Sequence, residues 1–235
     1  MLLHQLIPKQ GGLLLNGNFV RLYYESLKFS YMKINENKLV YTVGHSNHPI
    51  DYFAELLYTF SINCLIDIRS VPGSSYNPQF NKESLQNFLK NININYLHFG
   101  EEFGARHTEK ELLDIWGQVD FDKVRKTSKF ISGVERLNSG LGKGYTIALM
   151  CSEADPFDCH RFSMVSYYLV RNGFTVKHIL KDKTVIDNEE LEKKLLKKYD
   201  KQIPKTSLFE TVTIFDQLSL AYRLRNQEVA FDTLN

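Results

Sequence analysis

Short apolar runs alternate with amphipathic stretches along most of the chain. The apolar runs typical of strands lie at residues 40–43, 65–68, 94–99, 145–150 and 174–180. Apolar residues at helical spacing lie between them, as at Phe53, Leu56, Leu57 and Phe60. Strands that alternate with helices predict an α/β fold, with a mostly parallel sheet, helices on both faces and a Rossmann-like arrangement.

Residues 37–201 carry this pattern and are predicted to form a single α/β domain. Residues 1–36 show no sustained period and are predicted to be an N-terminal extension. Residues 202–235 are predicted to be a C-terminal tail with a short helix near 218–224. Further helices are expected at residues 109–116, 121–138 and 181–201.

Polar residues follow four of the predicted strands at the point where each strand ends. They are His45 and Ser46, then Asp67 and Arg69, then His98 with Glu101 and Glu102, and finally Cys151 and Glu153. The carboxyl ends of parallel strands meet at one edge of a sheet, and ligands bind there. The sequence therefore predicts one polar site at this edge.

The segment after the strand at residues 145–150 concentrates reactive side chains. Asp158 is predicted to cap a helix whose first turn contains Cys159, His160 and Arg161. The free backbone N–H groups of a helix start favour anions, and the same field lowers the pKa of a thiol. A site that binds an anion or activates a cysteine is therefore expected here.

Composition narrows the class of protein only slightly. The 235 residues carry a formal net charge of +2, which gives no electrostatic sign of nucleic-acid binding over the whole chain. Three cysteines without regular spacing indicate a reducing compartment. No apolar run approaches the roughly 18 residues of a membrane span, so we expect a cytoplasmic protein with no membrane partner.

Several of these motifs together resemble the bacterial and archaeal domain-of-unknown-function 488 family. The matching residues are Thr42-Val43-Gly44-His45-Ser46, Asp67-Ile68-Arg69-Ser70 with Pro72, Asn77-Pro78 with Phe80, Tyr96, His98, Leu149-Met150-Cys151-Ser152-Glu153 with Pro156, and Cys159-His160-Arg161. The resemblance covers about residues 40–180. It implies an α/β fold with a shared polar site, and it implies no particular reaction.

The first functional hypothesis is a hydrolase or group transferase that acts on a phosphate-bearing substrate, either a nucleotide or nucleic acid. The catalytic candidates are Cys151, Glu153, His45 and Asp67. The candidates for binding the substrate or its anion are Arg69, Ser46, Arg106, Arg161, Tyr76 and Asn77. The sequence identifies no cofactor, and it contains no dinucleotide glycine fingerprint.

Each candidate also has a structural interpretation. Cys151 fits a buried packing residue near a strand end. Asp67 fits a buried ion pair with Arg69 or Arg161, because ion-pair networks perturb acids as active sites do. His98 fits a satisfied core histidine.

Two further hypotheses remain open. The first is a metal-binding protein centred on Cys151, Cys159 and His160, with His45 or His98 as a fourth ligand, although this spacing matches no standard zinc finger. The second is a non-catalytic nucleic-acid-binding module. Residues 206–209 resemble the end of peptides that bind bacterial sliding clamps, with Lys205 where such peptides carry Gln.

Overall fold

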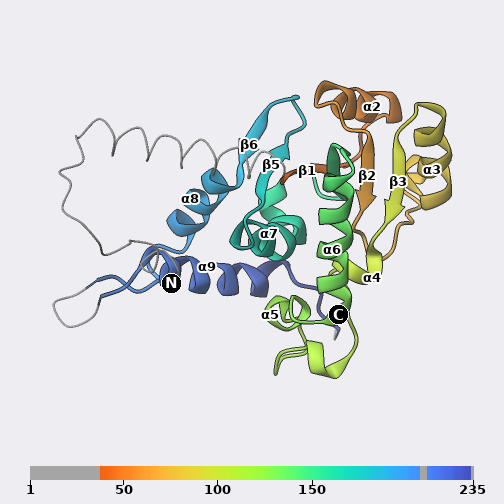
Figure 1. Ribbon diagram of the computed structural model, residues 1–235. Helices are drawn as coiled ribbons and strands as arrows, with labels where there is room; N and C mark the ends of the chain where they lie inside the picture. The colour runs from red at the N-terminus through yellow and green to blue at the C-terminus, as the bar shows by residue number, and fades with distance from the viewer. Residues whose placement is uncertain (1–37, 207–210, 234–235) are drawn as a thin grey trace, which may run out of the picture. The chain divides into compact units, whose positions relative to one another are not determined.

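A computed structural model describes residues 38–206 and 211–233. These residues fold around a six-stranded sheet (Figure 1). Its strands, in spatial order, are β3 (Asn95–His98), β2 (Cys64–Asp67), β4 (Ile147–Cys151), β1 (Leu39–Gly44), β5 (Thr175–Ile179) and β6 (Val185–Asp187). Four neighbouring pairs are parallel, and only β5 and β6 are antiparallel. The predicted α/β class and mostly parallel sheet are confirmed.

The direction in which successive strands are added to the sheet reverses once along the chain. The chain runs outward from β1 through α2 (Ile50–Thr59) to β2, and through α3 (Lys82–Asn91) to the edge strand β3. It then returns through α6 (Ser128–Gly142), and β4 inserts between β2 and β1. Parallel crossovers are right-handed, so the reversal places the later helices on the opposite face. It also opens a crevice beyond the end of β4.

Two apolar cores fill the two faces of the sheet. Ile66 and Leu149 pack with Phe130 and Leu137 of α6, whereas Leu65, Ala148 and Met150 pack with residues of α2 and α3. Successive residues of a strand point to opposite faces, so these runs are apolar on both sides. Helices therefore cover both faces, as the sequence predicts.

The segment after β5 differs from the prediction. The charged stretch at 181–201 contains the short strand β6 before α8 (Asn188–Lys198) begins. The helix expected near 218–224 is the longer α9 (Ile214–Val229). α8 and α9 share a third apolar core, in which Leu191, Leu195 and Tyr222 contact Phe162.

The stretch between β3 and β4 is less helical than expected. Residues 109–116 form only the short turn η2 (Lys110–Leu112), and a four-residue helix, α4 (Gly100–Phe103), precedes it. The helix expected at 121–138 is divided into α5 (Phe121–Val124) and α6. Thr127 causes the division, because its hydroxyl accepts the backbone N–H of Phe130 and caps α6.

The helix after β4 does not begin at the predicted cap. Asp155, not Asp158, accepts a backbone N–H, at 2.8 Å from Phe157, and it caps the short turn η3 (Pro156–Asp158). Cys159 is extended, and the π-helical turn η4 (Arg161–Ser166) follows and continues into α7 (Tyr167–Arg171). Asp158 fails as a cap because η3 already contains it.

Among the described residues, no helix combines the length and apolar character needed to cross a membrane.

Candidate functional site

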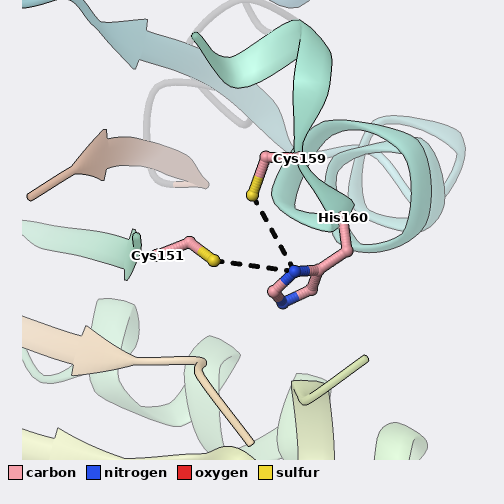
Figure 2. A group of neighbouring side chains, drawn as sticks. All are labelled: Cys151, Cys159 and His160. Carbon is pink, nitrogen blue, oxygen red and sulfur yellow. Dashed lines mark hydrogen bonds between the residues drawn. The ribbon is translucent and has the colours of Figure 1, made fainter. Parts of the chain in front are cut away.

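Three metal-ligating side chains meet where β4 ends and η4 begins. Cys151 is the last residue of β4, and Cys159 and His160 immediately precede η4. Both sulfur atoms face the same ring nitrogen, with Nδ1 of His160 at 3.6 Å from Cys151 and 3.8 Å from Cys159 (Figure 2). All three donor atoms lie within 4.8 Å of one another, and the three side chains are buried or nearly so.

A backbone contact orients the His160 ring. Its Nε2 lies 3.3 Å from the carbonyl oxygen of Ile68, just after β2. A carbonyl only accepts, so Nε2 carries the hydrogen and, in the neutral ring, Nδ1 keeps its lone pair. That lone pair faces the two thiols.

Arg161 stabilises negative charge on Cys159. The sulfur of Cys159 accepts the backbone N–H of Arg161 at 3.4 Å. Burial raises the pKa of the Cys159 thiol, but the Cys151 thiol, the Arg161 guanidinium and His160 outweigh it, and the net pKa is well below the usual value. Burial and the neighbouring Cys159 raise the pKa of Cys151 well above its usual value. Of the two sulfurs, Cys159 is therefore the one that ionises first.

Glu153 stands at the rim of this cluster. Its Oε2 accepts the thiol hydrogen of Cys151 at 3.0 Å. The residue as a whole is exposed, but its carboxyl group contacts the buried Cys151 thiol and is partly removed from water. This desolvation and the charge of Cys159 raise the pKa of Glu153 above its ordinary value. A carboxylate with a raised pKa, next to donor atoms, is suited to proton transfer.

The buried Arg161 side chain holds the loop that carries Glu153. Its guanidinium is 0% exposed and donates to the backbone carbonyls of Glu153, at 2.7 Å, and Ala154, at 3.0 Å. No carboxylate of the described residues lies within 4.0 Å of it. The structure therefore places Arg161 neither in a buried ion pair nor at an exposed anion site, but on the backbone of the loop.

A second polar network closes the end of β2. Asp67 is 0% exposed and accepts from the Arg69 side chain at 2.6 and 2.9 Å and from the Tyr96 hydroxyl at 2.8 Å. Arg69 also donates to His45, at 3.0 Å between Nη1 and Nε2. Burial, followed by the charge of Arg69, lowers the pKa of His45 to about 4. This network contains the predicted Asp67–Arg69 ion pair, and its acid and histidine have their acceptor atoms occupied.

A cavity of about 220 Å³ adjoins the three-residue cluster. It is lined by Arg69, Ser70, Val71, Ala105, Arg106, Cys151, Ser152, Glu153, Asp158, Cys159, His160, Val229 and Phe231. The cavity lies at the carboxyl edge of the sheet, where the strand order reverses, as expected for a ligand site in an open α/β sheet.

One family model matches the chain. It is described as "Domain of unknown function DUF488", and it covers residues 49–169, just over half of the chain. The chain belongs to the DUF488 family. No curated protein and no solved structure matches it at a significant level.

The DUF488 domain brings some of the predicted site residues to the cavity and leaves others away from it. Those at the cavity are Arg69, Arg106, Cys151, Glu153, Cys159 and His160. Tyr76 is 92% exposed on the loop before η1 (Pro78–Phe80), and neither it nor Asn77 lines the cavity. His98 donates from Nε2 to the Arg69 carbonyl oxygen, 2.9 Å away.

Ser46 lies outside the cavity, and most of the clamp-like peptide lies outside the described residues. Ser46 adopts a positive φ of 49° in the turn after β1, and its hydroxyl contacts Asn47. Of the peptide that resembles a clamp-binding motif, residues 207–209 lie outside the described part of the chain, as do residues 1–36.

Sequence reasoning missed Val229 and Phe231, which line the cavity from the end of α9. These residues lie beyond the matched part of the DUF488 family. They are apolar and distant in sequence from the motifs, so no local signal marks them.

Proposed function

We propose that this protein is a metal-dependent hydrolase. Its metal would be a divalent transition metal, with zinc as the best fit, bound by Cys151, Cys159 and His160. The observation that carries the proposal is the convergence of both sulfurs on one imidazole nitrogen, at 3.6 and 3.8 Å. Two thiolates and an imidazole are a ligand set found in zinc enzymes.

The spacing of the donors supports this choice. A tetrahedral zinc ion with bonds of about 2.3 Å to sulfur and 2.0 Å to nitrogen sets those ligands about 3.5 Å apart. The measured separations exceed that value by only 0.1 to 0.3 Å on this estimate. The two sulfurs lie within 4.8 Å of each other, against about 3.8 Å in such a site, so side-chain movements of up to about 1 Å are enough to enclose the ion.

The surroundings of the donors also favour a metal ligand set. The contact from Nε2 of His160 to the Ile68 carbonyl is the kind of support that orients a ligating histidine. The backbone N–H of Arg161 and the buried guanidinium stabilise thiolate charge at Cys159. A free catalytic thiol at Cys151 is disfavoured because burial raises its pKa, whereas a bound cation would itself lower that pKa and stabilise the thiolate.

Hydrolysis follows from the number of protein ligands and from Glu153. Three protein ligands leave a fourth position for water, which is typical of catalytic zinc sites. An ion held there supplies Lewis acidity and lowers the pKa of the bound water. With an ion held by the three side chains, Glu153, whose Oε2 lies 3.0 Å from the Cys151 sulfur, would take a proton from the attacking water and return it to the leaving group as the scissile bond breaks.

The proposal is tested first by metal content. The full chain should bind about one zinc ion, and its cobalt form should show thiolate-to-metal charge transfer. Cys159→Ser and His160→Gln should each lower zinc affinity at least tenfold in a chelator competition. Cys64→Ala is the matched control, because Cys64 is an equally buried cysteine outside the cluster. Equal zinc affinity in all three variants would contradict the proposal.

Glu153→Gln tests the hydrolytic part. The amide keeps the shape but takes up no proton, so the variant should retain zinc and lose about 10²–10⁴-fold in turnover. Turnover of para-nitrophenyl phosphate by the zinc-loaded protein is the measurement. Unchanged turnover in a zinc-loaded Glu153→Gln would exclude Glu153 as the base.

A further inference from the structure

The segment after α9 forms one wall of the cavity. Val229 and Phe231 line it, although they lie some 70 residues after His160. The backbone of Val119 donates to the Phe231 carbonyl at 3.0 Å. The Asn226 side chain accepts from the backbone of Phe121 at 2.7 Å and donates to the Val119 carbonyl at 2.8 Å. The wall is therefore built into the fold by long-range hydrogen bonds.

Arg225 ties the same helix to the metal-ligand loop. It is only 4% exposed, donates to the Phe157 carbonyl at 3.1 Å and pairs with Asp158. Asp158 precedes Cys159 directly and also lines the cavity. α9 is thus fixed to two sides of the site, and Arg225 is shared between Asp158 and Glu228.

Arg106 is the cation of the cavity that is available to a ligand. Its guanidinium lies over the Phe231 ring, 5.5 Å from the centroid, and the residue is exposed. Within the described residues, no carboxylate lies within 4.0 Å of it. Arg69, by contrast, uses four of its N–H groups on Asp67, Phe80 and His45.

We propose that Arg106, supported by Phe231, binds an oxyanionic group of a small substrate, with a phosphate group as the best match. This inference rests on the proposed hydrolytic site, because it assigns the substrate class of the same cavity. The planar fork of Arg106 presents two parallel N–H groups to an oxyanion. The cavity of about 220 Å³ is smaller than common drug-sized sites, and Val229 and Phe231 bound it on one side, so we expect the bound substrate to be a small molecule rather than a polymer.

Calorimetric titration of the zinc-loaded full chain with inorganic phosphate tests the assignment. Arg106→Gln should weaken phosphate binding at least tenfold, and Arg106→Lys should weaken it less, because the charge remains. Arg223→Gln is the control: it removes an exposed arginine of α9 that does not line this cavity, and it should bind as the wild type does. Zinc content is measured for every sample.

The outcomes separate the two proposals. Zinc-loaded Arg106→Gln that binds phosphate as wild type does, or wild type that binds no phosphate at millimolar concentration, overturns the Arg106 assignment and leaves the metal site intact. Arg106-dependent phosphate binding by a protein that takes up no zinc overturns the metal site alone. A single-stranded oligonucleotide that binds more tightly than phosphate, through Arg106, overturns the restriction to a small substrate.

Discussion

At the scale of single residues, the site depends on a close backbone approach that only glycine allows. A Cβ atom at Gly44 would lie 1.9 Å from the carbonyl oxygen of Glu153. The same oxygen accepts the Arg161 guanidinium at 2.7 Å. Gly44 therefore leaves room for the loop after β4 to approach β1, and Arg161 holds the carbonyl of that loop, so the position of Glu153 depends on both.

Gly44→Ala should lower the free energy of unfolding by about 1–3 kcal/mol, because the new methyl group forces the backbone of the loop to move. Gly142→Ala is the matched control, since a Cβ at Gly142 meets nothing within 4 Å at the end of α6. That change should stabilise the protein by up to about 1 kcal/mol. Urea unfolding measures both, and equal effects would contradict the close approach.

At the scale of elements, the end of β2 is held by a buried ion pair. Asp67 and Arg69 are 0% and 6% exposed and lie 2.6 Å apart. Tyr96 of β3 donates to the same carboxylate, so the network joins two neighbouring strands. Removal of one charge from such a pair leaves the other buried without a partner.

Asp67→Asn should therefore cost on the order of 3–5 kcal/mol in unfolding free energy. Tyr96→Phe removes one hydrogen bond to the same carboxylate and should cost about 1–2 kcal/mol. Thermal and urea unfolding provide the comparison. If Asp67→Asn unfolds like the wild type but loses turnover, Asp67 takes part in catalysis, as the sequence first suggested, and the structural role is wrong.

At the scale of the whole molecule, α9 belongs to the packed body of the described chain. Its Ala221 and Tyr222 are buried at 0% and 2% exposure against Phe162 of η4 and Leu191 of α8. The helix thus covers the element that directly follows the proposed metal ligands. Removal of α9 would therefore expose the apolar core that it shares with α8 and η4.

A variant that ends at Lys205 should have a free energy of unfolding lower than that of the full chain by more than about 3 kcal/mol. The reason is that the loss of even one large buried side chain typically lowers this free energy by about 3 kcal/mol. Ile214→Ser and Phe215→Ser are the controls. These side chains are 59% and 58% exposed, and their replacement should change stability by less than about 0.5 kcal/mol. A truncated chain of full stability would support the separate C-terminal tail predicted from the sequence.

The sheet and the cluster at its edge could be predicted from sequence because they depend on local pattern. The run before Cys151 is apolar on both faces, and a buried parallel strand has that composition. The end of that strand fixes where Cys151 lies. The trio of Cys151, Cys159 and His160 was identified only as one of three hypotheses, because sequence spacing does not show distances.

Other features depend on contacts between distant segments, which sequence pattern does not contain. The sequence indicates an anion-binding role for Arg161. Its hydrogen bonds to the carbonyls of Glu153 and Ala154 form only in the folded loop, so the sequence pattern does not reveal them. The wall formed by Val229 and Phe231 requires α9 to dock on residues 118–121. The local spacing of apolar and polar residues predicts neither contact.

The π-helical turn Arg161–Ser166 makes the proposed site sensitive to the deletion of a residue. Loss of one residue from this turn would restore an ordinary α-helix and rotate one end against the other by about 100°. Leu169 of α7 is buried at 0% exposure and anchors the helix that follows the turn. The rotation would therefore fall on Cys159 and His160 and turn them away from Cys151. In this chain the extra residue of the turn is therefore as necessary for bringing the three side chains together as their identity is.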